Sequence, residues 1–523
     1  MHDIELVLMV LLAAVALFAA VSSAIGVPYP IVLVLGGLVL GFVPGLPDVQ
    51  LPPNLVLVIF LPPLLYYAAF YVSLRDVRAD LRTISLLAVG LVIATAAAVA
   101  VVAHAMIDGL PWAAAFTLGA IVAPTDPIAA TAVLHRVGAP RRMVNILEGE
   151  SLINDGSALV IYRAAIAAVG GSFSLLEAGA TFVLDAAGGI LIGLVVGKLI
   201  AEFRRRLDDP PVEVTISLLS GYAGYVPAER IGVSGVLAAV TVGVYVGWLA
   251  PEISTARMRL HGGAMWEILT FLLNALLFVL IGLQLPRVID GLGGDLSSSL
   301  VMTAIVICLV VIGCRMVWVH AVTFLIRAID RRAVQRARRG SWRERFVAGW
   351  AGMRGAVSLA AALALAPGFP ARDEILFITF AVIFATLVLQ GLTLPAVIRW
   401  AHLRQDDGDA REDLLARRAA TSAALARLDE LALVEWTRDD TIERMRGLYR
   451  YRERRLEARA GDGVGEDGEN YEHRSLKYQK LVRQVIDAQR AAVVDLRNRG
   501  EISNEVMHRI ERELDLEDGR LEI

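Results

Sequence analysis

The sequence places acidic residues in segments that otherwise suit the interior of a membrane. Asp126 stands between Pro124 and Pro127, and Glu150 and Asp155 follow in the next apolar segment. Charged side chains are costly inside a membrane, so those that occur there usually bind ions, carry protons or pair with one another. Removal from water disfavours the charged form of a carboxylate, and such a group can hold either a proton or a metal cation. Asp155, the deepest of the three, is therefore the first candidate for an ion-carrying residue.

The segment around Asp126 predicts a break in a helix. Its sequence, Ala123-Pro-Thr-Asp-Pro127, places a proline on each side of the acid, and each proline removes a backbone donor and disturbs the preceding turn. Free carbonyl groups beside a carboxylate suit cation binding, and irregular backbone is tolerated in membranes where it lines a cavity. The alternative is a kinked packing helix in which Asp126 caps the second half, a role that does not exclude ion binding.

The segment 148–157 carries three carboxylates in what we expect to be one membrane-spanning helix. Ser151 and Asp155 are about one turn apart and share a face, and Glu148 lies about two turns from Asp155 on that side. Glu150 lies further around the helix. A helix that faced lipid would not carry three acids. We interpret this segment as the wall of an ion site, with a structural polar network as the alternative.

Two arginines, Arg315 and Arg354, are also predicted to lie within apolar spans, and Arg354 is flanked by glycines that permit close helix approach or a break. A buried arginine needs an anion. Glu150 and Asp126 are the available partners. Pairing would keep Glu150 charged and would leave Asp155 as the group that titrates, because neighbouring carboxylates in different surroundings take different roles.

The elements that position these residues are expected to be transmembrane helices. The chain is 56% hydrophobic, whereas soluble proteins are usually about 45–50% apolar, and the excess lies in residues 1–404. A membrane core needs about 20 apolar residues per helix, and this requirement predicts about thirteen spans. We expect the first span to be a helix of the mature protein and not a signal peptide. The approximate limits of the spans are 4–24, 28–43, 54–72, 83–106, 112–135, 143–169, 176–203, 212–227, 232–249, 264–285, 298–326, 345–366 and 374–400. We expect an all-α polytopic membrane protein.

The loop arginines predict the orientation of these spans, because Lys and Arg concentrate on the cytoplasmic side. With the N-terminus outside, the outer loops hold only Arg230, Arg287 and Arg372. The inner loops then hold the remaining groups, namely Arg75, Arg78, Arg82, Arg136, Arg141, Arg142, Arg204, Arg205, Arg206, Arg257, Arg259 and the cluster 327–345. We therefore expect a cytoplasmic C-terminus. We interpret the basic run 331–339 as a loop that touches anionic lipid, with nucleic-acid binding as the alternative.

Residues 405–523 are highly charged and contain no apolar run long enough to span a membrane. Leucines recur there at near-helical spacing, which predicts a cytoplasmic helical tail. This tail serves regulation or dimer contacts, or it is a partly ordered segment without a specific role.

The spacing of the two break motifs predicts internal symmetry. The motif at Asp126 lies on the fifth span and the motif at Arg354 on the twelfth. An odd offset reverses direction, so we expect two inverted repeats of about six helices each, with broken helices that cross at the midplane, which is a transporter plan.

Four motifs occur in order along the chain: Phe60-Leu-Pro-Pro-Leu64, Ala123-Pro-Thr-Asp-Pro127, Gly149-Glu-Ser-Leu-Ile-Asn-Asp155 and Gly352-Met-Arg-Gly355. Together they resemble the monovalent cation/proton antiporter family, and more closely its bacterial sodium/proton antiporters, which are related to the animal sodium/proton exchangers. The resemblance covers residues 1–400 and extends to the end of the tail. It implies exchange of Na⁺, with Li⁺ or K⁺ as alternatives, for H⁺ across the inner membrane by alternating access, for pH and sodium homeostasis. It also implies a homodimer with a dimerisation domain and a moving core domain.

The resemblance assigns roles to the site residues. Asp155 corresponds to the carboxylate that carries the ion and the proton, and Asn154 to the neutral partner found in the electroneutral branch. Thr125, Asp126 and Ser151 complete the cation site, in which Asp155 and Asp126 contact the transported Na⁺.

The resemblance also implies a structural ion pair between Glu150 and Arg315, with Arg354 nearby. Some archaeal members have an acid in the third span that this sequence lacks, which leaves the ligands on that side open. No cofactor is expected apart from the transported ions, and no enzymatic activity.

Other classes of function are less consistent with these residues. Buried carboxylates also fit a cation channel or a membrane-embedded sensor, but arginines beside them disfavour a pore for cations. An intramembrane aspartyl protease with Asp126 and Asp155 as its dyad is disfavoured because neither a Tyr-Asp nor a Gly-x-Gly-Asp motif occurs.

Overall fold

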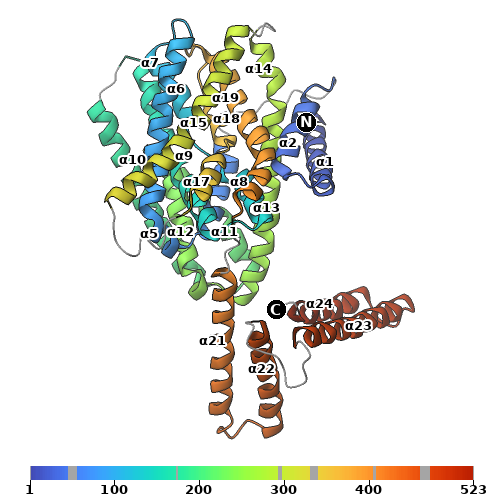
Figure 1. Cartoon of the computed structure of the whole chain (residues 1–523). Coiled ribbons are helices and arrows are strands. Elements are labelled where there is room, and N and C mark those ends of the chain that lie inside the picture. Colours follow the sequence, from blue (N-terminus) through green and yellow to red (C-terminus); the bar gives the residue numbers. More distant parts are fainter. Residues whose placement is uncertain are drawn as a thin grey trace. The chain divides into compact units, whose positions relative to one another are not determined.

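The computed structural model of the chain describes residues 2–44, 56–171, 175–292, 297–329, 340–403, 408–459 and 471–521. Every element in these ranges is helical (Figure 1), which confirms the predicted all-α fold. The chain separates into two compact units, Met1–Gln405 and Asp406–Ile523; the predicted boundary was between residues 404 and 405. The basic run 331–339 lies outside the described residues.

The helices of the first unit follow the predicted spans. They are α1 (His2–Ile25), α2 (Tyr29–Gly41), η1 (Val56–Phe60), α4 (Leu61–Phe70), α5 (Leu74–Ser85), η2 (Leu86–Leu91), α6 (Val92–Met106), α7 (Trp112–Val122), α8 (Pro127–Val137), α9 (Arg141–Val169), α10 (Leu175–Arg204), α11 (Pro210–Ile231), α12 (Gly235–Ile253), α13 (Ala256–Leu283), α14 (Leu285–Gly291), α15 (Ser298–Ile329), α17 (Trp342–Trp350), α18 (Ala356–Leu363), α19 (Arg372–Phe384), η3 (Ala385–Gln390) and α20 (Gly391–Ala401). Within the described residues, 8 segments are long and apolar enough to cross a membrane. The count of thirteen crossings stays a prediction.

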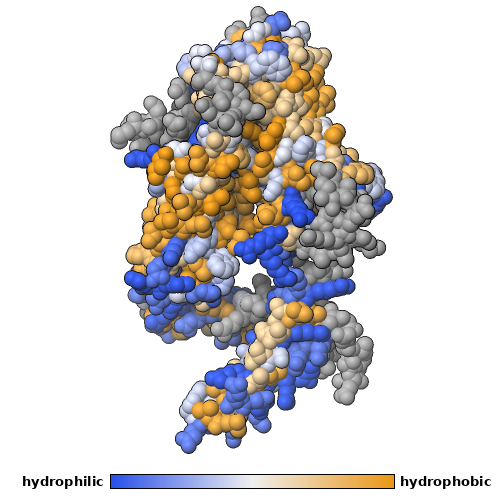
Figure 2. All heavy atoms as spheres, turned by 90° about the vertical axis from the view of Figure 1, so that its left-hand side faces the viewer, coloured by the Kyte–Doolittle hydropathy of each residue, from blue (hydrophilic) through white to orange (hydrophobic). Residues whose placement is uncertain are grey.

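Apolar side chains cover much of the surface of this unit, as the broad hydrophobic area in Figure 2 shows. The helix α10 illustrates the pattern, because Leu184, Leu191 and Leu199 are each more than half exposed. A soluble domain rarely exposes a continuous apolar surface of this kind. Contact with lipid explains it, and the predicted membrane character of this unit is thereby supported.

The segment 75–82, which the sequence analysis placed in a cytoplasmic loop, is helical and forms α5. The side chain of Ser73 accepts a hydrogen bond from the backbone N of Asp76 at 3.3 Å and caps the start of this helix. Arg142 of α9 then holds Asp80 through two hydrogen bonds, of 2.9 and 2.5 Å. These polar contacts, which hydropathy does not register, extend the helix beyond its apolar part.

Two groups of helices pack mainly within themselves, and α9 of the second group also contacts α4, α10 and α12 of the first. The helices α4, α10, α11 and α12 pack against one another, whereas α6, α7, α9 and α15 form a second group. The pair α2 and α13 packs closely, and a side chain at Gly37 or Gly282 would collide with the backbone of the facing helix. Glycine therefore permits this close approach.

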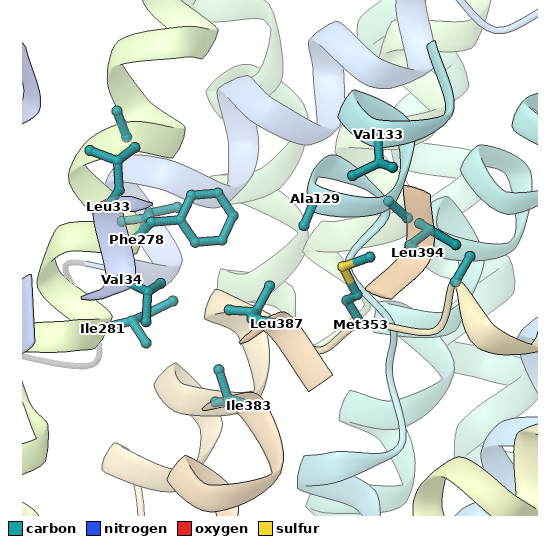
Figure 3. Packing of buried hydrophobic residues seen from close by; sticks show 14 of the residues in the cluster. Leu33, Val34, Ala129, Val133, Phe278, Ile281, Met353, Ile383, Leu387 and Leu394 are labelled. Atoms are coloured by element: carbon teal, nitrogen blue, oxygen red, sulfur yellow. The ribbon is translucent and has the colours of Figure 1, made fainter. Parts of the chain in front are cut away.

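A hydrophobic cluster joins the α2–α13 pair to the helices around both breaks (Figure 3). Leu33 of α2 and Phe278 of α13 belong to the same buried cluster as Val133 of α8 and Met353 between α17 and α18. Leu394 of α20 belongs to the same cluster and is labelled beside Met353 in Figure 3. Apolar packing therefore holds both breaks against the neighbouring helices.

The second unit consists of α21 (Gly408–Leu431), α22 (Asp439–Arg459), α23 (Tyr471–Asn498) and α24 (Asn504–Leu521). The helix α21 packs on α22, and α23 packs on α24. In the second pair, Ile486 and Met507 are buried, and Arg490 donates to Asp515 at 2.7 Å. The helical character of the tail is confirmed, and its role stays a prediction.

Candidate cation site

The first break separates α7 from α8. The helix α7 ends at Val122 and α8 begins at Pro127, so the backbone between them is irregular, as the two prolines predicted. The Asp126 side chain accepts a hydrogen bond from the backbone N of Ile128 at 2.9 Å. This contact caps the first turn of α8, so the capping alternative describes part of the role of Asp126.

The second break, between α17 and α18, meets the first. The backbone N of Asp126 donates to the carbonyl of Met353 at 2.8 Å, and Nε of Arg354 donates to the carbonyl of Val122 at 3.2 Å. A side chain at Gly355 would collide with the Asp126 carboxylate. The glycine in this motif is thus required for the close approach of the two broken helices, whose crossing was predicted.

Thr125 connects the first break to α9. Nδ2 of Asn154 donates to Oγ1 of Thr125 at 2.8 Å, and the Ser151 hydroxyl donates to the Thr125 carbonyl at 3.1 Å. Oγ1 of Thr125 in turn donates to Oε1 of Glu150 at 3.1 Å. The predicted site residues are therefore brought together. The hydroxyl groups of Thr125 and Ser151 both take part in these hydrogen bonds, which hold the first break against α9.

Glu150 and Arg315 form a buried ion pair in which each side chain is 1% exposed. Nη2 of Arg315 donates to Oε2 at 2.9 Å and Nη1 donates to Oε1, the bidentate geometry that favours such a pair. Arg354 differs from the expectation of a carboxylate partner. Its guanidinium donates to the carbonyls of Val122 and Gly352, because the broken helix ends leave carbonyl groups without helical partners beside it.

A cavity of about 360 Å³ lies next to this crossing. Thr125, Asp126, Ser151 and Asp155 line it together with other residues of α4, α8, α9, α13 and α18. Asp155 is 7% exposed. Among the residues that the structure describes, none forms a hydrogen bond or an ion pair with its carboxylate, whereas Glu150 is neutralised by its arginine. The Asp155 oxygen atoms are therefore available to an ion in the cavity.

Similarity to known proteins identifies the family to which this site belongs. Residues 10–400 match the family described as sodium/hydrogen exchanger, transmembrane. An uncharacterized Na⁺/H⁺ exchanger of Mycobacterium tuberculosis is 37% identical over 531 residues, with 98% of this chain and 96% of the relative covered. The chain belongs to the sodium/hydrogen exchanger family. This exchanger therefore moves Na⁺ and H⁺ in opposite directions across a membrane, and the predicted function is confirmed to that extent.

Other proteins that are similar to this exchanger are also described as cation/proton antiporters. It is 38% identical over 415 residues to the sodium, potassium, lithium and rubidium/H⁺ antiporter of Bacillus pumilus, with 75% of this chain and 61% of the relative covered. It is 35% identical over 408 residues to the Na⁺/H⁺ antiporter ApNhaP of Aphanothece halophytica, with 77% and 75% covered. Its fold is similar to that of the sodium proton antiporter MjNhaP1 of Methanocaldococcus jannaschii, with a TM-score of 0.59 and 20% identity over 77% of this chain and 99% of that one.

Two residues of the cavity wall, Asn274 of α13 and Ser358 of α18, were missing from the predicted site. Neither is charged, so neither stands out in an apolar span as a buried acid or arginine does. Asn274 is the amide in an otherwise largely apolar run, 268–283, which was a usable signal. Ser358 offered none, since small hydroxyl residues are common where membrane helices pack.

Proposed function

We propose that Asp155 binds either one proton or one Na⁺, never both, and that the exchanger alternates the access of this residue between the two sides of the membrane. The observation that carries this proposal is the carboxylate of Asp155, which faces the cavity while Glu150 is paired with Arg315. A carboxylate with accessible oxygen atoms in a site of low polarity binds a proton or a cation in preference to remaining charged alone.

The charges at the crossing support an electroneutral exchange. At the crossing itself, Asp126, Glu150 and Asp155 contribute three negative charges, and Arg315 and Arg354 contribute two positive charges. Glu148 lies about two turns of α9 away from Asp155, outside the crossing. One negative charge remains, and either one proton or one Na⁺ neutralises it. Asn154 adds no second titrating group, so each half of the transport cycle carries the same charge. Exchange of one proton for one cation then moves no net charge across the membrane.

The cavity is placed on one side of Asp155, which supports alternating access. Glu148, near the start of α9, and Tyr71, at the end of α4, both line it. With an N-terminus outside the cell, as we propose from the loop arginines, these residues face the cytoplasm. Toward the other end of α9, Arg163 pairs with Glu229 of α11 at 2.7 Å. The structure thus fits an inward-facing state of an inner-membrane protein, and we propose a homodimer.

Lowering the pH should raise the apparent KM for Na⁺, because protons compete for the same oxygen atoms of Asp155. Where Asp155 is mostly protonated, the apparent KM should rise about tenfold per pH unit, as mutually exclusive binding requires. The maximal rate at saturating Na⁺ should change much less. Proton flux in everted vesicles, measured with Na⁺, Li⁺ and K⁺ in turn at several pH values, provides both quantities. A maximal rate that falls with pH at a constant KM would place the proton on another group.

A further inference from the structure

One wall of the cavity is formed by α13, a helix that belongs to neither broken pair. Two polar residues of this wall, Thr270 and Asn274, line the cavity that also contains Asp155. They are four positions apart and therefore lie about one turn apart on the same face. Asn274 is 7% exposed, as little as Asp155 itself.

The hydrogen bonds of these two residues differ. The hydroxyl of Thr270 donates to the carbonyl of Trp266 at 2.7 Å, within its own helix. The amide of Asn274 makes no hydrogen bond with any residue that the structure describes, and its Oδ1 is buried without a partner. A buried amide without partners costs free energy. Such a group is expected where a ligand or an ordered water supplies the missing contact.

We propose that Asn274 supplies a neutral oxygen ligand to the transported cation, opposite the charged ligand Asp155. This inference rests on the proposed function of Asp155. Since no hydrogen bond holds the amide at either end, a rotation about its last side-chain bond brings Oδ1 or Nδ2 to the cavity. An amide oxygen replaces part of the hydration shell of an alkali cation, as carbonyl oxygens do in ion-selective pores.

A neutral ligand at this position has two consequences. It leaves the charge at the site unchanged, so one cation still neutralises Asp155. It also favours the cation over the proton, because a proton bound to a carboxylate needs one oxygen atom whereas a metal cation needs several. The third span, 54–72, offers no acidic ligand, and α13, which packs on α4, supplies a neutral ligand on that side.

The test uses the full-length protein in proteoliposomes, with titrations of Na⁺, Li⁺ and K⁺ at one pH. Asn274→Leu keeps most of the side-chain volume and removes the oxygen atom. It should raise the apparent KM for Na⁺ about tenfold, equivalent to the loss of one favourable contact, and should change the ratio of kcat/KM among the three cations. Thr303→Val of α15 is the control, because Thr303 is buried, its hydroxyl donates to the carbonyl of Ser299 within its own helix, and it does not line the cavity. It should leave both quantities unchanged.

The outcomes separate this inference from the proposed function. Should Asn274→Leu fold poorly, as judged by size-exclusion chromatography, Asn274→Ala replaces it in the same titrations. An unchanged KM for every cation would overturn the ligand role, and so would an equal loss of maximal rate for all three cations at constant KM. Neither result would bear on exchange by the unmodified protein, so the proposed function would stand. If Asp155→Asn retained coupled exchange, the proposed function itself would fail.

Discussion

Replacing Asp155 with asparagine should reduce coupled exchange to the background of empty vesicles while the protein folds normally. The amide has nearly the same shape but neither binds a proton nor carries the negative charge that attracts a cation. No hydrogen bond or ion pair of the Asp155 carboxylate with the described residues holds the fold together. Removal of a buried charge without a partner removes a desolvation cost, so the thermal stability in detergent should be equal or higher. Na⁺ should also cease to raise the Tm of the purified protein.

Asp185→Asn is the matched control for this variant. Asp185 of α10 is also 7% exposed, but it lies away from the cavity, 4.0 Å from Nη1 of Arg163. Its replacement makes the same chemical change at equal burial and should leave Na⁺-dependent proton flux in place. Exchange that survives in Asp155→Asn, or that disappears equally in both variants, would contradict the assignment of Asp155 as the ion-carrying residue.

Replacing Arg315 with alanine should cause the largest loss of stability among single substitutions at the site. The change leaves Glu150 charged, buried and without its partner. Breaking a buried pair in this way costs about 3–5 kcal/mol, much more than the pair contributes relative to an apolar replacement. The Tm in detergent, measured by thermal unfolding with a fluorescent reporter, should fall markedly below that of Asp155→Asn.

Two further variants make this result specific. Arg163→Ala removes an arginine whose side chain is 44% exposed in its pair with Glu229, and a pair of this kind contributes about 0–1 kcal/mol. The double variant Glu150→Ala with Arg315→Ala removes both buried charges and should recover part of the lost stability. If Arg315→Ala kept the full Tm, or if the double variant were less stable than either single one, the pair would not have the role that the structure assigns to it.

The breaks and the residues of the site could be predicted because their signals are local. Prolines on both sides of Asp126 forbid a continuous helix, and acids in apolar spans exclude a lipid-facing surface. The pair of Glu150 with Arg315 was predictable only as a choice among few partners, since these residues are 165 positions apart and their approach depends on the packing of α6 against both α9 and α15.

Three features of the structure could not be predicted from such local signals in the sequence. The extension of α5 depends on a polar cap and on the contact of Asp80 with Arg142. A hydropathy pattern does not reveal such polar contacts. The contacts of Arg354 with carbonyl groups depend on where the broken helices meet. Asn274 is neutral, and its significance follows only from its place in the cavity wall and from its missing hydrogen bonds.

The most direct test of the account is the effect of a membrane potential on exchange in proteoliposomes. The central claim is that Asp155 carries one proton or one Na⁺ and that no other group at the site titrates during the cycle. Na⁺-driven proton movement, recorded at several pH values with an imposed potential of either sign and without one, should proceed at the same rate in all three conditions. Exchange that is accelerated by one sign of the potential and slowed or reversed by the other would show that unequal charges are carried, and the mechanism based on one carboxylate would then be wrong.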